Sequence, residues 1–436
     1  MSENSLSLRY HESDPPGKIE VVPTKPCRDK NDLSLAYTPG VAEASEKISL
    51  EKEAAYRYSS KGNLVGILTN GTAVLGLGSI GALAAKPVME GKSMLFKRFA
   101  DIDSFDIEIE EKDPERFIEV AKAIAPTFGA INLEDIRAPE CFSIEKELAS
   151  SLDIPVFHDD QHGTAVVVGA ALLNALECAN KKIAEIAIAI SGAGAAGLAC
   201  AEFLVSLGAD PERMVLADIQ GVLHRGRSLH PVQERWARKT EARTLAEILV
   251  GADFFLGVSA GGILSPEMLA SMKNFPIVFA LANPVPEISY EAAKKARPDC
   301  LLATGRSDTP NQVNNALAFP FLFRGALDVR AERINEPMKL AAARELAQLA
   351  HEAVPPEVRK AYEGESLSFG PNYLIPKLFD ARLLSRVSLA VAEAAIASGC
   401  AKKEGKNNEG LVFDRENYRR ALEARSRKIA ERFEIS

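Results

Sequence analysis

Residues 186–208 read IAIAISGAGAAGLACAEFLVSLG, which is an apolar run, a glycine-rich turn and a helix-length apolar segment in immediate succession. The run MVLAD follows at 214–218 and ends in Asp218. A strand, a G-x-G-x-x-G turn, a helix and a second strand ending in an acidic residue form the fingerprint of dinucleotide-binding sheets. The stretch therefore predicts a doubly wound domain of the Rossmann type.

Each glycine of the turn has its own physical role. Gly192 permits the tight turn, Gly194 lets the backbone approach a pyrophosphate, and Gly197 allows the helix to pack closely on the strand. Free N–H groups at the start of the helix favour phosphate. The alternative is that the glycines serve packing alone. We predict a nucleotide site whose cofactor-binding residues are Gly192, Ala193, Gly194, Ala195, Ala196, Gly197 and Asp218.

A second glycine motif, GLGSIG at 76–81, also follows an apolar run. Asp101 lies about twenty residues further on, as the dinucleotide fingerprint requires. It sits in FADID, however, with no convincing strand before it. We interpret this motif as an active-site turn rather than as the main cofactor site.

Outward from the turn, short apolar runs alternate with helix-length segments along the chain, which predicts α/β architecture. Most of the runs are continuously apolar, as in parallel strands covered by helices on both faces. We predict an amino-terminal α/β domain over 1–161, a Rossmann-type domain over 162–400, and a charged tail over 401–436 with a helix capped by Asp414. The predicted strands are 64–70, 105–110, 130–133, 154–157, 186–191, 214–218, 254–258, 276–281 and 301–305.

Composition narrows the class of protein. The 436 residues are 47% hydrophobic, which is enough for two or three domain cores. The net charge of −8 and the lack of a basic arm argue against a nucleic-acid partner. The six cysteines are scattered, with no CxxC pair, so we expect neither a zinc cluster nor a disulfide framework. With no signal peptide and no membrane-length apolar run expected, we predict a soluble cytoplasmic protein without a membrane partner.

Carboxylates follow two of the predicted strands. Glu134 and Asp135 come after AINL, and Asp159 and Asp160 lie in VFHDDQHGTA at 156–165. Burial of so many ionisable groups is costly unless they are paired or bind a metal, and Mg²⁺ prefers such oxygen ligands. Taken alone, either pair would more often be a helix cap or a solvated turn. By the same reasoning Lys92 would be a surface lysine and Tyr37 a core aromatic.

Several long motifs resemble the malic enzyme family in its short bacterial branch. The resemblance extends from about Tyr10 to about Cys400 and is closest to the malic enzyme half of bacterial hybrid enzymes, and it ends where their phosphotransacetylase-like domain begins. The motifs are TKPCRDKNDLSLAYTPGVA, KGNLVGILTNGTAVLGLGSIGALAAKPVMEGKSMLFKRF, INLEDIRAPECF, VFHDDQHGTA, SGAGAAG, FALANPVPEI and ATGRSDTPNQVNNALAFPFLFRGALD.

The resemblance implies oxidative decarboxylation of L-malate to pyruvate and CO₂ with reduction of NAD⁺ or NADP⁺. Lys92 corresponds to the general base that takes the C2 hydroxyl proton, assisted by Asp159, and Tyr37 to the acid that protonates C3. The base needs a pKa lowered from about 10.4, which a neighbouring cation would achieve. Mg²⁺ or Mn²⁺ would be bound by Glu134, Asp135 and Asp160.

The same resemblance implies contacts to substrate or cofactor from Asn283, Asn314 and Asn315, and a homodimer or higher homo-oligomer. His158 and His162 are expected to order the aspartates rather than to react. The sequence departs from relatives at two positions. Ala73 stands where long-subunit malic enzymes carry an arginine for the substrate carboxylate, so that carboxylate must be bound by another group.

The second departure concerns the nucleotide. Gln220 stands where the hybrid enzymes often carry a lysine suited to a 2′-phosphate. Asp218 with an uncharged Gln220 favours NAD, whereas Arg225 and Arg227 leave NADP open.

Two other functions remain as alternatives. A malolactic-type enzyme would use the same residues and release lactate without net redox change. A non-catalytic, metabolite-sensing subunit would need a broken site, whereas all the expected residues are present: Tyr37, Lys92, Glu134, Asp135, Asp159 and Asp160.

Overall fold

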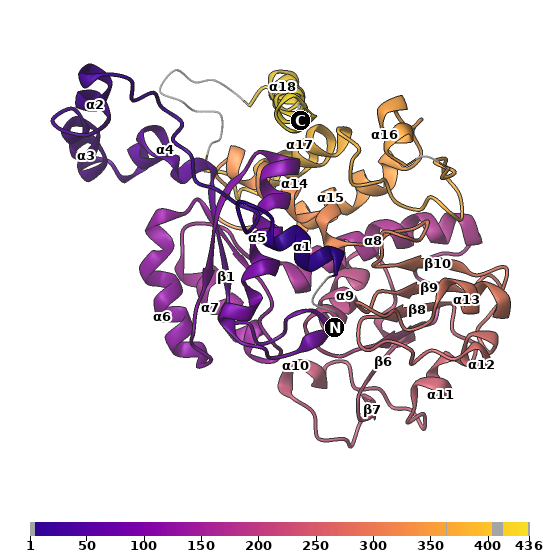
Figure 1. The fold of residues 1–436 in the computed structure, drawn as a ribbon. Coiled ribbons are helices and arrows are strands. Elements are labelled where there is room, and N and C mark those ends of the chain that lie inside the picture. Colours follow the sequence, from indigo (N-terminus) through magenta and orange to yellow (C-terminus); the bar gives the residue numbers. More distant parts are fainter. Residues whose placement is uncertain (1–4, 363, 403–412, 435–436) are drawn as a thin grey trace.

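The computed structural model describes residues 5–362, 364–402 and 413–434 and divides its strands between two sheets (Figure 1). The first sheet has the order β2-β1-β3-β4, and all its neighbouring strands are parallel, as predicted. Its strands are β1 (Leu64–Thr69), β2 (Asp103–Glu108), β3 (Ala130–Leu133) and β4 (Val156–His158).

The second sheet has the order β10-β9-β8-β5-β6-β7. Its neighbouring strands are parallel except for β7, which pairs antiparallel with β6. From β5 the chain winds first to β6 on one side and later to β8 on the other, so the predicted doubly wound fold is confirmed. The strands are β5 (Ile188–Ser191), β6 (Met214–Asp218), β7 (Gly221–Val222), β8 (Phe254–Gly257), β9 (Ile277–Ala280) and β10 (Leu301–Thr304).

Four strands differ clearly from the prediction. β4 and β5 each begin two residues later than expected, at Val156 and Ile188. β2 begins two residues earlier than the expected 105–110, because it lies at the edge of its sheet, where no residue of the strand is fully buried and the apolar pattern is weak. β7 was not predicted, since two residues are too short to leave a hydrophobic period.

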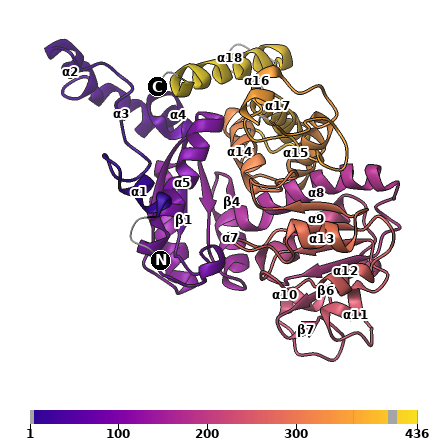
Figure 2. The same cartoon turned by 45° about the vertical axis from the view of Figure 1, so that its right-hand side comes forward.

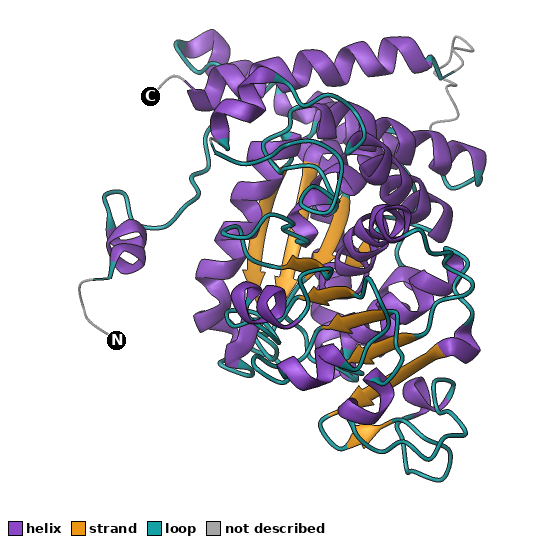
Figure 3. Cartoon of the chain, turned by 90° about the vertical axis from the view of Figure 1, so that its right-hand side faces the viewer, coloured by secondary structure: helices purple, strands orange, loops and turns teal. Residues whose placement is uncertain are grey.

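Helices cover both sheets and form a third layer above them (Figure 3). The amino-terminal half contributes α1 (Leu6–Glu12), α2 (Lys30–Ala36), α3 (Val41–Leu50), α4 (Ala55–Tyr58), α5 (Ala82–Ala100), α6 (Pro114–Ile124), α7 (Glu140–Ser151) and α8 (Asp159–Ala179). The rest contributes α9 (Ala195–Ser206), α10 (Pro231–Glu234), α11 (Leu245–Leu249), α12 (Pro266–Ala270), α13 (Tyr290–Ala296), α14 (Phe319–Asp328), α15 (Glu336–Leu349), α16 (Pro356–Ala361), α17 (Arg382–Ala397) and α18 (Arg415–Glu434).

Helix α8 connects the two sheets. It begins directly after β4 of the first sheet and packs against α9 of the second, so the predicted boundary at 161/162 falls inside a continuous helix. Among the described helices, α8 alone is long and apolar enough to cross a membrane by length and composition, and 67% of that apolar window is buried inside the protein. The expectation that no segment reaches this length is therefore wrong at α8, whose apolar surface is used in core packing.

The carboxyl-terminal helix is part of the fold rather than a free tail. Asp414 caps α18 as predicted, since its Oδ1 accepts hydrogen bonds from the backbone N–H groups of Glu416 and Asn417, both at 3.0 Å. Helix α18 packs on α17 and α5, and Leu422 and Ile429 are buried. Residues 403–412 of the predicted linker lie outside the described residues.

Helices α2 and α3 form an arm that projects from the body of the molecule (Figures 1 and 2). Neither helix contains a buried residue. The arm nevertheless exposes several large apolar side chains, namely those of Leu33, Leu35, Tyr37, Val41 and Leu50. Helix α2 is capped by Asp29, which accepts hydrogen bonds from the backbone N–H groups of Asn31 and Asp32, whereas Gly40 gives α3 no side-chain cap. The apolar faces of both helices lack a buried contact within the described residues.

Candidate active site

A cavity of about 810 Å³ lies between the two sheets. Parallel strands bring their carboxyl ends to the edges that face it, which is where open α/β sheets bind ligands. The cavity is lined by most of the predicted site residues: Lys92, Glu134, Asp135, Asp160, Gly194, Ala195, Ala196, Asn283, Asn314 and Asn315. The fold therefore brings Lys92 and Asn315, the first and last of these residues in the sequence, to one cavity.

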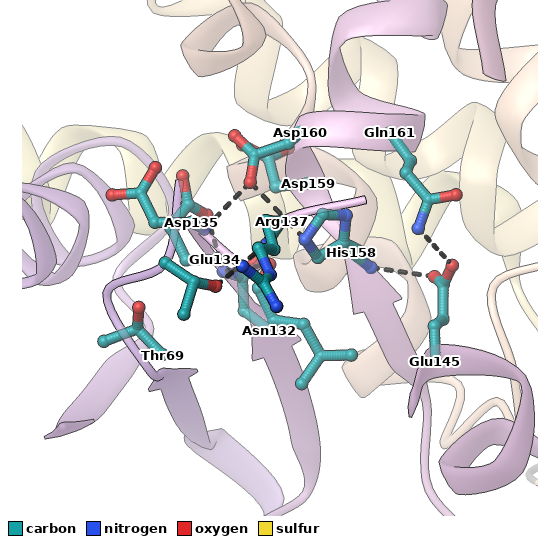
Figure 4. A network of polar contacts seen from close by, with 12 residues as sticks. Thr69, Asn132, Glu134, Asp135, Arg137, Glu145, His158, Asp159, Asp160 and Gln161 are labelled. Atoms are coloured by element: carbon teal, nitrogen blue, oxygen red, sulfur yellow. Dashed lines mark hydrogen bonds and ion pairs between the residues drawn. The ribbon is translucent and has the colours of Figure 1, made fainter. Parts of the chain in front are cut away.

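Three carboxylates gather on one wall of the cavity. Glu134 and Asp135 follow β3, and Asp160 lies in the first turn of α8 (Figure 4). One oxygen from each lies within 4.8 Å of the others. The backbone N–H of Asp135 donates to Asp160 Oδ2 at 2.8 Å, whereas Asp135 Oδ2 is buried without a hydrogen-bond partner. This donor set fits a hard divalent cation such as Mg²⁺ or Mn²⁺.

The electrostatics of the cluster support the same interpretation. Burial raises the pKa of Asp135 to about 9, with Asp160 and Glu134 adding to the rise. Burial also raises the pKa of Glu134 to about 7, although the ammonium of Lys92 opposes it. Carboxylates crowded in this way repel one another, and a bound dication would neutralise them.

Lys92 lies on α5 and is only 6% exposed. Its Nζ donates to Asp159 Oδ2 at 2.6 Å and lies 2.9 Å from Glu134 Oε1. It also sits 4.2 Å from the centroid of the Phe319 ring. The side chain is therefore fixed in direction by two carboxylates and an aromatic face, and it is not the surface lysine that its sequence context alone suggests.

The pKa of Lys92 is set by burial and by two carboxylates. Burial by itself lowers this pKa, but Asp159 and then Glu134 outweigh burial and raise it above the ordinary value. The expected lowering depends on a bound cation and stays a prediction, since without one two carboxylates face the ammonium.

Asp159 is fully buried, and burial raises its pKa to about 6 while Lys92 opposes the rise. Gly163 makes room for it, since a Cβ at that position would lie 1.8 Å from Asp159 Oδ1. The glycine of the HDDQHG sequence is thus required by the aspartate one helical turn before it. Asp159 lies beside Lys92, and its expected assistance to that lysine stays a prediction.

The glycine-rich turn has the predicted shape. Gly192 has a φ of +115°, and its N–H donates to the carbonyl of Ala217 at 2.8 Å. Above Gly194 the nearest atom to an added Cβ is 4.0 Å away, which leaves the backbone open to the cavity. Helix α9 begins at Ala195, so its first N–H groups face this space. The turn therefore suits a pyrophosphate.

Gly197→Ala is expected to lower the free energy of unfolding by about 2 kcal/mol and to weaken dinucleotide binding, because overpacking displaces the backbone. The added Cβ would lie 1.8 Å from the carbonyl oxygen of Gly192. Thermal unfolding and titration with NAD⁺ measure the two effects. Gly62→Ala is the matched control, since its Cβ would meet no atom closer than 3.5 Å. Wild-type stability and affinity in Gly197→Ala would contradict the close packing of turn and helix.

Asp218 ends β6 and is held by its neighbours. Arg227 Nη2 donates to Asp218 Oδ2 at 2.5 Å and to Gln220 Oε1 at 3.0 Å. The backbone N–H of Gln220 donates to Asp218 Oδ1 at 2.8 Å. Asp218, the acidic residue of the fingerprint, is therefore paired with Arg227, one of the two arginines that left NADP open in the sequence.

The three asparagines reach the cavity in different ways. Asn283 precedes a cis peptide bond to Pro284, and its backbone is approached closely by Gly76 of the second glycine motif. Asn315 lines the cavity beside the start of α8. Asn314 Oδ1 accepts a hydrogen bond from the backbone N–H of Ala316 at 3.0 Å, so its side chain also serves as a helix cap.

His158 and His162 contact different carboxylates. His158 is fully buried, and its Nε2 lies 3.5 Å from Asp160 Oδ2, which agrees with a role in ordering that aspartate. Burial lowers the pKa of His158 to about 4. His162 instead contacts Glu145 at 3.0 Å, so the expectation that it orders the aspartates directly is wrong.

Glu145 of α7 is a site residue that the sequence did not reveal. It accepts hydrogen bonds from the backbone N–H of His158 at 2.8 Å and from Gln161 Nε2 at 2.9 Å, besides its contact with His162 (Figure 4). The carboxylate therefore holds the first turn of α8, which carries Asp159 and Asp160. Nothing in its local sequence distinguishes it from a surface glutamate.

Tyr37 does not reach this cavity within one chain. It ends α2 on the projecting arm and is 70% exposed, and it is not among the residues that line the cavity. The expectation of a core aromatic is wrong, because the arm has no intramolecular partner. Within its own chain, Tyr37 is therefore not placed to act as the expected acid.

Comparison with known proteins agrees with the geometry. The family description "Malic enzyme, N-terminal domain" matches residues 16–149, and "Malic enzyme, NAD binding domain" matches residues 161–362. The NAD-dependent malic enzyme of Rhizobium meliloti is 53% identical over 401 residues, which are 91% of this chain and 52% of that protein. This chain spans about half the length of the first relatives that it matches.

Other relatives match along almost their entire length. The NADP-dependent malic enzyme of Halomonas elongata is 52% identical over 92% of this chain and 96% of its own. The crystal structure of malic enzyme from Pyrococcus horikoshii superimposes with a TM-score of 0.87 at 42% identity, covering 98% of this chain and 96% of that one. This chain therefore belongs to the malic enzyme family.

Proposed function

We propose that this protein oxidatively decarboxylates L-malate to pyruvate and CO₂ while NAD⁺ or NADP⁺ is reduced. The observation that carries the proposal is the position of Lys92, whose amine lies between Asp159 and Glu134 in a cavity shared with the glycine-rich turn. A base beside a nucleotide site is what removal of a hydroxyl proton with hydride transfer requires.

Each group in the cavity has a defined task in this reaction. Lys92 accepts the C2 hydroxyl proton, and Asp159 and Phe319 keep its Nζ in place. Glu134, Asp135 and Asp160 would hold the cation. A bound Mg²⁺ or Mn²⁺ supplies Lewis-acid stabilisation of negative charge on the substrate oxygens, and its charge favours the neutral form of the nearby lysine.

We propose a preference for NAD⁺. The guanidinium of Arg227 is occupied by Asp218, Gln220 and the carbonyls of Gly221 and Val222. A 2′-phosphate would have to compete with the Asp218 carboxylate for this cation, whereas a ribose hydroxyl can donate to that carboxylate. Relatives named for NAD and for NADP both occur, so this preference belongs to the individual chain.

The direct test is malate-dependent reduction of NAD⁺ and NADP⁺, measured side by side with Mn²⁺ and again with chelator. Pyruvate and reduced nucleotide should appear in equal amounts, NAD⁺ should give the higher kcat/KM, and both products should vanish with chelator. Lactate without net nucleotide reduction would favour a malolactic-type enzyme. Nucleotide binding without turnover would favour a metabolite-sensing subunit.

We further propose a homodimer in which the arm of one subunit supplies Tyr37 to the cavity of the other. The exposed apolar side chains of α2 and α3, together with the distance of Tyr37 from its own cavity, support this arrangement. A reciprocal exchange of arms closes with two-fold symmetry and covers both apolar faces.

Mixing two inactive variants tests the exchange. Tyr37→Phe and Lys92→Ala should each lose turnover, but co-expressed subunits should recover roughly a quarter of wild-type activity, because half the dimers are mixed and one of their two sites is intact. Activity is measured on the purified mixture, with each variant alone as the control. An inactive mixture that demonstrably contains mixed dimers would contradict supply of Tyr37 by the partner.

A further inference from the structure

The substrate of the proposed reaction is a dicarboxylate, and Ala73 on the cavity wall offers no charge to either carboxylate. The cationic side chains that line the cavity are therefore candidates to bind one of them. Lys92 is already paired with two carboxylates. Arg137 Nη2 is paired with Glu140 Oε1 at 2.5 Å, and half of the Arg137 side chain is exposed.

Lys18 is the remaining lysine of the cavity wall. Its backbone N–H donates to Glu90 Oε2 at 3.0 Å, two residues before Lys92 on α5. Its Cε lies 3.7 Å from the position that a Cβ on Gly91 would take, so the aliphatic stem lies along the helix beside the lysine base. Figure 2 shows the amino-terminal helix α1 beside α5. Tyr10 of α1 and Lys18 both line the cavity.

The ammonium of Lys18 is not held in a hydrogen bond or ion pair within the described residues, and Glu90 is the acidic group that acts on it. Among the hydrogen bonds and ion pairs of residues 5–362, 364–402 and 413–434, the Lys18 side chain takes part in none. Burial lowers the pKa of Lys18 below its ordinary value, and Glu90 opposes the shift. A partly desolvated ammonium that is not held in an ion pair interacts more strongly with an anionic ligand than an exposed one does.

We infer that Lys18 binds the C1 carboxylate of malate, the carboxylate that remains in pyruvate. This inference rests on the proposed function. A cation fixed on the C4 carboxylate would oppose decarboxylation, because that group leaves as neutral CO₂ and its charge is already dispersing in the transition state. A cation on the retained carboxylate loses nothing as the bond breaks.

The test compares Lys18→Met with the wild-type enzyme in the presence of Mn²⁺ and NAD⁺. Because hydrogen bonds between charged groups contribute more than neutral ones, KM for malate should rise about 10- to 100-fold. The inhibition constant for pyruvate should rise by the same factor, since pyruvate keeps the C1 carboxylate. The KM for NAD⁺ and the Mn²⁺ affinity from direct titration should stay at their wild-type values.

Two further variants make the result specific. Lys112→Met removes the same charge from an exposed loop outside the cavity and should leave all constants unchanged. Lys18→Arg keeps the charge and should recover part of the affinity for both malate and pyruvate.

Three outcomes would overturn the inference in distinguishable ways. Unchanged malate and pyruvate constants in Lys18→Met, with an active wild-type enzyme, would remove Lys18 from the substrate site. A rise for malate without a rise for pyruvate would place Lys18 at the C4 carboxylate instead. Absence of malate oxidation in the wild-type enzyme would overturn the proposed function, and with it the inference.

Discussion

Lys92→Ala is expected to reduce kcat for malate oxidation by about 10³-fold, within the range that a positioned acid or base contributes to catalysis. The substitution removes the amine that lies 2.6 Å from Asp159 Oδ2 and leaves that buried carboxylate without its partner. The affinity for NAD⁺ should remain unchanged, because Lys92 lies on α5 and not in the glycine-rich turn. Initial rates and nucleotide titration on the same preparation measure both.

The control for this variant comes from the same helix. Lys86 is also on α5, but it is 40% exposed at its side chain and pairs with Asp106 outside the cavity. Lys86→Ala should therefore keep its turnover within a few-fold of wild type. If Lys92→Ala still oxidised malate at the wild-type rate, another group would have to be the base.

Arg324→Ala is expected to lower the free energy of unfolding by about 3–5 kcal/mol, the usual cost of leaving a buried charge without its partner. Arg324 is 2% exposed and lies on α14. Its guanidinium donates to Asp328 and to Asn63, which directly precedes β1, and Tyr418 of α18 donates to Asp328 at 2.9 Å. One arginine thus joins the first sheet to two helices of the upper layer.

Chemical denaturation measures this loss. Arg333→Ala is the control, because the Arg333 side chain is 64% exposed and its nearest acidic partner, Glu332, lies 3.7 Å away. That substitution should change stability by about 0.5 kcal/mol or less. Equal stabilities of the two variants would show that the link through Arg324 does not hold the layers together.

The features that were predictable from sequence are those with a local physical requirement. The turn around Gly192 needs a positive φ, and the packing at Gly197 excludes a Cβ, so glycines mark both positions. Continuous apolar runs indicated parallel strands, and Glu134 and Asp160 were expected near one another because the carboxyl ends of parallel strands share an edge.

The features that were missed depend on contacts between distant segments. Glu145 acts through α8, and Lys18 reaches the cavity only because its segment crosses α5. The raised pKa of Lys92 follows from the simultaneous approach of two carboxylates, which no spacing in the sequence reveals. Tyr37 lies on an arm whose two helices contain no buried residue.

Helix α8 couples the candidate metal site to the relative position of the two sheets. Asp160 belongs to the first turn of a helix that packs against α9 of the second sheet, whereas Glu134 and Asp135 belong to the first. Any rocking of the nucleotide-binding half that carries α8 with it stretches or compresses the gap between these oxygens. A cation held by all three carboxylates would therefore link the two halves, and its affinity would depend on how far the cleft between them is open.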